Sequence, residues 1–249
     1  MNYLSWLADP ANWSGPGSIP VQILVHLAYS LISLVIAMLI ALPLGVYIGV
    51  TGKGVNLIAG IANTLRALPS IGVLVLAVML VSLAFTNDLA YQIPTIIVLV
   101  MLGIPPILTN TYAGIQATDP AAVDAARGMG YSTRQVLWHV QIPCALPLML
   151  SGVRSAFLQI ISTATIAAVV SLGGLGRFII DGGATSNYPE MVGGAIVVAA
   201  VALAVELILV GVGHLVVSPG LRRTNARRAR VSSAKPEPST ATIALDLTP

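Results

Sequence analysis

Residues 23–50 read ILVHLAYSLISLVIAMLIALPLGVYIGV and contain no charged side chain. The uncharged region extends on both sides of this stretch, from Pro10 to Gly52. About 20 predominantly apolar residues are enough for a helix to cross the hydrocarbon core of a bilayer. The stretch therefore predicts a membrane-spanning helix from Ile23 to Val50. Its length and uniform hydrophobicity exclude an outer-membrane barrel, whose strands alternate over about ten residues.

Four more apolar stretches follow along the chain. They predict spans at Ser70 to Phe85, Pro94 to Ile115, Leu148 to Val170 and Val192 to Val217. A helix satisfies its own backbone hydrogen bonds inside hydrocarbon, so each span is expected to be helical. The predicted fold is an all-α membrane protein with about five transmembrane helices. We expect an external segment at 1–22, a transmembrane domain at 23–217 and a basic, disordered tail at 218–249.

The composition excludes several classes of protein. Charged residues make up 8% of the 249 residues and hydrophobic residues 56%, with a mean hydropathy of +0.90. Soluble domains carry roughly 25% charged residues, so a soluble domain is excluded, and nucleic-acid binding with it. The single cysteine, Cys144, cannot form an intramolecular disulfide. His26, His139 and His214 have no ligand-type residue at metal-binding spacing, which predicts no metal site.

The basic residues indicate the orientation of the chain in the membrane. Ten of the twelve lie in alternate loops and in the tail, whereas Arg177 lies in a loop on the other side and Arg154 near the start of the fourth span. Cytoplasmic loops carry the excess of Lys and Arg. This predicts an external N-terminus and a cytoplasmic C-terminus. The pI of about 9.2 therefore reflects topology rather than an acidic partner.

The cytoplasmic loop of residues 116–146 is too organised to be a simple connection. Asp119 before Pro120 is a typical N-cap, and the following residues include four alanines. Gly128 and Gly130 end this first helix, and Ser132 with Gln135 three positions later forms a capping box for a second helix, which Pro143 is expected to stop. The small-residue face of the first helix suits docking into a groove on a partner. A helical hairpin that merely packs beneath the bundle is the alternative.

The same loop resembles the EAA loop of ABC-importer permeases, in which the residues E-A-A are followed by three residues, a glycine, nine residues and I-x-L-P. The spacing matches without a gap, with Asp124 in place of Glu, Val140 in place of Ile and Ile142 in place of Leu. The matching positions are Asp124, Ala125, Ala126, Gly130, Val140, Ile142 and Pro143. Residues 105–112, 173–176 and 179–182 are similar to segments of the osmoprotectant branch, which takes up glycine betaine, carnitine or choline. The resemblance covers about residues 20–220.

The resemblance implies a permease subunit that moves a small compatible solute, of the glycine betaine, carnitine, choline or proline type, across the bacterial inner membrane by alternating access. It also implies several partners: two ATP-binding ABC subunits, which bind ATP and Mg, a second permease copy or paralogue, and an extracytoplasmic substrate-binding protein. The EAA loop would form the coupling helix that contacts the ATPase. The chain itself is not expected to be an enzyme or to hold a cofactor, because Gly52-Lys53 lacks the other positions of a P-loop.

Other functions are alternatives. An ABC permease for another small solute, such as an amino acid, fits the same motif. An autonomous secondary transporter is expected to show inverted repeats with broken helices, and an intramembrane enzyme needs a catalytic constellation. The sequence contains no internal repeat and no such constellation, so both are disfavoured.

Five residues are candidates for a translocation pathway. Pro105 and Pro106 are expected to kink or break the third span, next to Asn110 and Tyr112. Glu206 is the one carboxylate inside a predicted span, where a charge costs about 3 kcal/mol on insertion scales. The alternatives are helix–helix hydrogen bonding for the first group and a structural hydrogen bond for Glu206.

Three further features carry smaller predictions. Gly45 and Gly49 form a small-residue pair that predicts close helix packing. Arg154 is expected to extend toward the cytoplasmic face or to pair with the coupling loop. The external loop from Gly173 to Glu190 contains a short segment that predicts either a lateral helix, which could gate the outer mouth or receive a binding protein, or a flexible loop.

Overall fold

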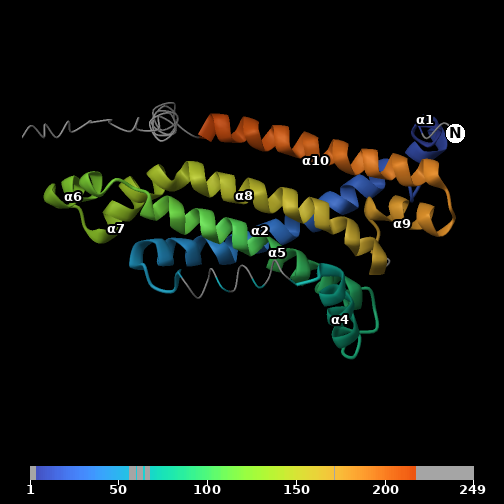
Figure 1. The fold of residues 1–249 in the computed structure, drawn as a ribbon, viewed down its shortest axis with the longest axis horizontal. Coiled ribbons are helices and arrows are strands. Elements are labelled where there is room, and N and C mark those ends of the chain that lie inside the picture. Colours follow the sequence, from blue (N-terminus) through green and yellow to red (C-terminus); the bar gives the residue numbers. More distant parts are fainter. Residues whose placement is uncertain (1–3, 56–59, 61–63, 65–67, 171, 217–249) are drawn as a thin grey trace, which may run out of the picture.

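Figure 1 shows the computed structural model of the chain, which describes residues 4–55, 60, 64, 68–170 and 172–216. The described part is helical and contains no strand. The predicted disordered tail at 218–249 lies outside the described residues. The elements in order are α1 (Ser5–Ala8), η1 (Pro10–Trp13), α2 (Ile19–Thr51), α4 (Ser70–Val81), α5 (Leu89–Gln116), α6 (Pro120–Gly128), α7 (Thr133–Val136), η2 (Leu137–Gln141), α8 (Ile142–Ala164), η3 (Thr165–Val170), α9 (Gly176–Ala184) and α10 (Tyr188–Val216).

Four regions of the described chain are long and apolar enough to cross a membrane. They are Ile19–Thr51, Leu89–Gln116, Thr133–Val170 and Tyr188–Leu215, and they confirm four of the five predicted spans. The second predicted span is present as α4, a shorter apolar helix of 12 residues. At 1.5 Å per residue α4 is about 18 Å long, less than the roughly 30 Å of the hydrocarbon core.

The core of the molecule lies between α2, α5 and α8. Buried aliphatic and aromatic side chains from all three helices form one cluster, which includes Leu34, Leu99, Ile107, Phe157 and Ile160. Lipid tails are as apolar as these side chains, so close van der Waals packing within the cluster stabilises the association of the three helices.

Glycines allow α2 and α5 to approach closely. A methyl group at Gly45 would lie 2.7 Å from Thr111 Cβ, and one at Gly49 would lie 2.6 Å from Ile115 Cβ. Both distances are shorter than van der Waals contact, so a larger residue would push the two helices apart. The packing role predicted for this glycine pair is confirmed.

The ends of the bundle are distinct (Figure 1). Helices α6 and α7 and the C-terminal end of α10 lie at one end of the long axis, and α1 and α9 lie at the opposite end. This arrangement agrees with the alternation of loops that the basic residues predict. Helix α10 packs against α8 and α9 but keeps a largely exposed apolar surface, with Leu203, Leu207 and Ile208 each at least 60% exposed.

Candidate coupling helix and membrane-embedded polar residues

Helix α6 begins as the sequence predicts. Asp119 has extended backbone angles, and its Oδ1 accepts a hydrogen bond of 3.0 Å from the backbone N–H of Ala121. Pro120 occupies the first helical position, where a missing N–H has no cost. The predicted N-cap is confirmed.

The end of α6 explains the glycine of the EAA pattern. Gly130 has a φ of +87°, in the left-handed region that favours glycine. The N–H of Gly130 donates to the carbonyl of Arg127 at 2.9 Å, and the N–H of Tyr131 donates to the carbonyl of Ala126 at 3.1 Å. These two bonds form a Schellman cap, which turns the chain from α6 toward α7.

The second helix also begins at the predicted cap. The backbone N–H of Ser132 donates to Gln135 Oε1 at 2.8 Å, and the N–H of Gln135 donates to Ser132 Oγ at 3.4 Å. This reciprocal pair is a capping box. Helix α6 therefore has a defined start and end, and α7 has a defined start.

The prediction that Pro143 stops this helix is wrong. The helix continues from α7 through η2, a single π turn, into α8. In that turn the N–H of Ile142 donates to the carbonyl of Leu137, five residues earlier. The wider turn carries one extra residue, which gives room for a proline ring that would collide with a carbonyl in a regular helix. The predicted coupling loop is thus joined without a break to an apolar helix long enough to span the membrane.

The seven EAA-pattern residues divide into two groups in the structure. Asp124, Ala125 and Pro143 are exposed, and the Asp124 side chain is 75% exposed. Ala126 is buried, with 2% exposed, and Gly130 forms the cap. The remaining positions, Val140 and Ile142, are half-buried. The exposed residues are available to a partner, whereas the others shape the loop.

Asp124 is also close to a basic side chain of its own helix. Its Oδ1 lies 3.7 Å from Arg127 Nη1, and both side chains are mostly exposed. Surface pairs of this kind contribute between 0 and about 1 kcal/mol. The pair therefore leaves both charges available for contact with another protein.

A kink or a break is predicted at Pro105 and Pro106. The break does not occur, because α5 is one helix from Leu89 to Gln116 with both prolines inside it. The prolines are buried, and a methyl group at Gly152 of α8 would lie 2.8 Å from the Pro106 carbonyl oxygen. Asn110 Nδ2 donates to that same carbonyl at 2.8 Å, and Thr109 Oγ1 donates to the Pro105 carbonyl at 2.8 Å. Close packing and these bonds within the helix hold the helix together.

The predicted pathway residues do not converge within one chain. Gly152 faces Pro106 and Asn110 on α5. Arg154, two residues further along α8, contacts Glu206 on α10. Side chains two positions apart on an α-helix point about 200° apart. Helix α8 therefore separates the α5 group from Glu206. Tyr112 is half-buried against the core cluster.

Glu206 and Arg154 form an ion pair between two spanning helices. Arg154 Nε donates to Glu206 Oε2 at 2.8 Å, and Arg154 Nη2 contacts Glu206 Oε1. The predicted structural hydrogen bond of Glu206 is confirmed. The predicted pairing of Arg154 with the coupling loop is wrong, because its guanidinium pairs with Glu206 on α10. Pairing matters here, since an unpaired charge in a membrane-spanning segment is costly.

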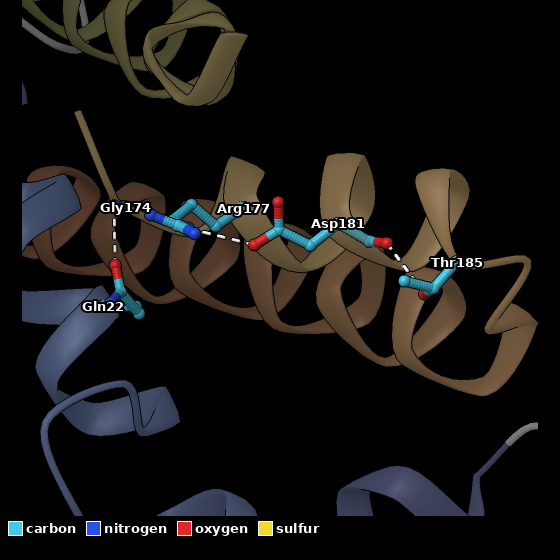
Figure 2. A network of polar contacts seen from close by, with 5 residues as sticks. All are labelled: Gln22, Gly174, Arg177, Asp181 and Thr185. Atoms are coloured by element: carbon cyan, nitrogen blue, oxygen red, sulfur yellow. Dashed lines mark hydrogen bonds and ion pairs between the residues drawn. The ribbon is translucent and has the colours of Figure 1, made fainter. Parts of the chain in front are cut away.

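The external loop contains a helix, α9, which confirms the lateral helix and not the flexible loop. Figure 2 shows the polar contacts that hold it: the N–H of Gly174 donates to Gln22 Oε1 of α2 at 2.7 Å, and Arg177 Nε donates to Asp181 Oδ2 at 3.0 Å. Thr185 Oγ1 donates to the Asp181 carbonyl at 2.9 Å. The first bond ties the start of the α9 segment to α2.

Sequence reasoning missed a cavity at the same end of the molecule. The cavity, of about 580 Å³, is lined by Tyr29, Asp88, Tyr91, Gln92, Val169, Val170 and Leu172. One signal was present in the sequence: Asp88 is the one acidic residue between positions 10 and 118. Its convergence with Tyr29, 59 positions earlier, depends on the packing of α2 beside α5. Within the described ranges, no group of three His, Cys, Asp or Glu side chains is arranged to hold a metal ion.

A comparison with protein families finds one match over most of the chain. Residues 41–223 match the family described as binding-protein-dependent transport system inner membrane component. The chain belongs to this family. It is therefore a permease, the inner membrane component of a binding-protein-dependent transport system, as the EAA resemblance predicts.

Curated relatives include permeases of osmoprotectant transport systems. The choline transport system permease protein OpuBB of Bacillus subtilis is 29% identical over 198 residues, which are 80% of this permease and 88% of the relative. The carnitine transport permease protein OpuCB of Listeria monocytogenes is 31% identical over 189 residues, 76% of this chain and 84% of the relative.

Solved structures share the fold. A chain of the inward-facing MetNI methionine ABC transporter aligns with a TM-score of 0.65 at 19% identity, covering 88% of this permease and 100% of that chain. At this identity the likeness supports the fold and carries no information about substrate.

Proposed function

We propose that this permease is the membrane-spanning subunit of an ATP-driven importer of a small quaternary ammonium solute, such as glycine betaine, carnitine or choline. Two separate ABC subunits bind and hydrolyse ATP, and an extracytoplasmic binding protein delivers the solute. Relatives that share about 30% identity over most of their length carry names with these solutes. Their names support the substrate class.

The observation that carries the coupling role is the surface of α6. Asp119 and Gly130 define its ends, and Ala121, Ala122 and Ala125 expose small side chains beside Asp124. A narrow helix with such a surface can enter a groove on a partner and bring its backbone close to the wall. The helix lies at the end of the molecule where the basic loops predict the cytoplasm (Figure 1).

The link from α6 to the membrane supports transmission of force. The chain runs from the Schellman cap of α6 into α7, η2 and α8 as a continuous helical segment from Thr133 to Val170. Movement of a docked α6 would therefore move a spanning helix directly. Alternating access in this proposal is a movement of the permease pair that ATP binding drives through these two loops.

A second permease, identical or paralogous, completes the pathway. The apolar surface of α10 is largely exposed in one chain, and the described pathway candidates do not converge within one chain. A pathway between two permeases accounts for both observations. The end that carries α1 and α9 is then the surface that receives the binding protein.

The coupling role is tested by placing a large, positively charged side chain on α6. Ala125→Arg in the reconstituted complex is expected to lower co-purification of the ATPase subunits and to abolish solute-stimulated ATP hydrolysis, because the exposed alanine contacts the groove. Ala11→Arg is the matched control for co-purification of the ATPase subunits alone, since Ala11 is an exposed alanine in η1, next to α1 at the end opposite α6. Full ATPase binding and full uptake by Ala125→Arg would show that α6 is not the coupling helix.

The substrate class is tested by uptake into proteoliposomes that contain the permease, its ATPase and its binding protein. Radiolabelled choline and glycine betaine are expected to accumulate with ATP inside and not with ADP. Uptake of an amino acid with no uptake of any quaternary ammonium compound would assign the permease to another substrate class.

A further inference from the structure

The cavity at the external end of the bundle is formed where three elements meet. Tyr29 comes from α2, Asp88, Tyr91 and Gln92 come from the first turn of α5 and its N-cap, and Val169 comes from η3. Its volume of about 580 Å³ is in the range of small-molecule sites, roughly 300–1,000 Å³. The N-terminal end of α5, which lines it, lies far from α6, toward the end where α9 is found (Figure 1).

The polar groups of the cavity interact with one another and leave a net negative charge. Tyr29 interacts with the Gln92 side chain and lies within electrostatic range of the Asp88 carboxylate. None of the ion pairs between described residues involves Asp88. Asp88 is exposed and Tyr91 is 45% exposed, so a solute that approaches the protein can reach both side chains.

These walls match a particular kind of cation. A quaternary ammonium group carries a diffuse positive charge covered by methyl groups, and it interacts well with the faces of aromatic rings. Tyr29 and Tyr91 supply two rings, and Asp88 supplies the opposite charge. The methyl groups can pack on the aliphatic part of the lining, Val169, Val170 and Leu172.

A primary ammonium group fits the same walls less well. It is a compact, strongly hydrated charge that needs several hydrogen-bond acceptors when it leaves water. The aliphatic part of the lining offers none. The Gln92 amide can in addition donate to a carboxylate, which glycine betaine and carnitine carry and choline lacks.

We propose that this cavity is a solute site of the permease itself, which binds the quaternary ammonium group between Tyr29, Tyr91 and Asp88. The inference rests on the proposed function, because it concerns the same solute. The cavity would be a second, selective binding site at the external end of the permease, separate from any site on the binding protein.

The test measures binding without the binding protein. The permease–ATPase complex in detergent is titrated with radiolabelled choline, and uptake is measured in parallel with the complete system. Tyr91→Leu and Tyr29→Leu are each expected to weaken choline binding roughly 2- to 30-fold, the range of one cation–π contact. Tyr91→Phe keeps the aromatic face and is expected to bind like the wild type.

Asp88→Asn removes the negative charge of the cavity and keeps the size of the side chain. It is expected to weaken choline binding roughly fivefold or more, by loss of one opposite charge at contact distance. Glycine betaine, which carries its own carboxylate, is expected to lose less. Tyr47→Leu and Asp9→Asn are matched controls, since both residues are exposed and lie outside the cavity lining.

The outcomes separate the two proposals. If the wild type takes up choline but Tyr91→Leu and Asp88→Asn bind it as the wild type does, the cavity is not a solute site and the proposed function stands. If lysine competes as well as tetramethylammonium, the cavity is a general cation site. If the wild type takes up no quaternary ammonium compound, the proposed substrate class itself is wrong.

Discussion

The ion pair between Arg154 and Glu206 provides a quantitative test of how α10 is held to the bundle. Arg154 lies about 18 Å along α8 from its start at Ile142, and Glu206 lies about 15 Å from the end of α10 at Val216, at 1.5 Å per residue. Both charges therefore lie well inside helices that are long and apolar enough to span a membrane. Glu206→Gln removes one charge and leaves the guanidinium without its counter-ion.

The expected loss follows from the cost of that unpaired charge. An arginine at the centre of a spanning helix costs about 2.5–3.5 kcal/mol on insertion scales. Glu206→Gln is therefore expected to lower the free energy of unfolding by about 3 kcal/mol. Arg154→Met is expected to cost less, because the remaining carboxyl group can bind a proton. The double variant Arg154→Met/Glu206→Gln leaves no charge and is expected to be more stable than Glu206→Gln.

The assay is thermal unfolding of the purified complex, followed by the loss of its monodisperse peak. For a chain of this size 1 kcal/mol corresponds to about 2–4 °C, so Glu206→Gln is expected to melt about 6–12 °C below the wild type. The double variant should recover part of this difference. Additive losses in the double variant would refute the pairing, as would an unchanged midpoint for Glu206→Gln.

Three further predictions concern helix packing and the coupling loop. Gly49→Leu places its Cβ 2.6 Å from Ile115 Cβ. Overpacking of this kind costs about 1–3 kcal/mol, so the midpoint of thermal unfolding is expected to fall by at least about 2 °C. Gly211→Ala is the control and should not lower the midpoint, because its Cβ would meet no atom within 4 Å. Gly130→Ala forces a Cβ into a φ of +87° and is expected to cost about 1–2 kcal/mol in the α6–α7 corner, seen as faster hydrogen exchange at the capped amides of residues 130–131. Ser132→Ala removes the cap of α7 at a cost of about 1 kcal/mol and should speed hydrogen exchange in residues 133–136. Ser132→Asp can cap the helix and should restore protection from exchange. Equal exchange in the two variants would contradict the capping box.

Much of the fold was predictable because the membrane simplifies the problem. Five spans were predicted from the absence of charge and four of them are confirmed, and the caps of α6 and α7 were predicted from local patterns of Asp-Pro and Ser…Gln. Caps depend on bonds between residues two or three positions apart, so the sequence contains all the necessary information. The EAA spacing identified the family for the same reason, since its residues lie in one loop.

Apart from the second span, which is present as the short helix α4, the errors concern prolines and a charge whose partners lie elsewhere. Pro143 does not end a helix, because a π turn absorbs its ring, and Pro105 and Pro106 do not break α5, because close contact with Gly152 and bonds from neighbouring polar side chains stabilise it. Arg154 was assigned to the wrong partner because Glu206 is 52 residues away. In each case local preference favoured one outcome and tertiary packing another.

The sequence by itself determined that the chain lies in a membrane and where α6 and α7 begin, and it predicted the orientation of the loops, because hydropathy, loop charge and capping are properties of consecutive residues. Tertiary structure decided which polar groups meet: Glu206 with Arg154, Gly174 with Gln22, and the tyrosines with Asp88. These pairings depend on the register and rotation of helices against one another. Side-chain packing sets that register, and no local pattern in the chain specifies it.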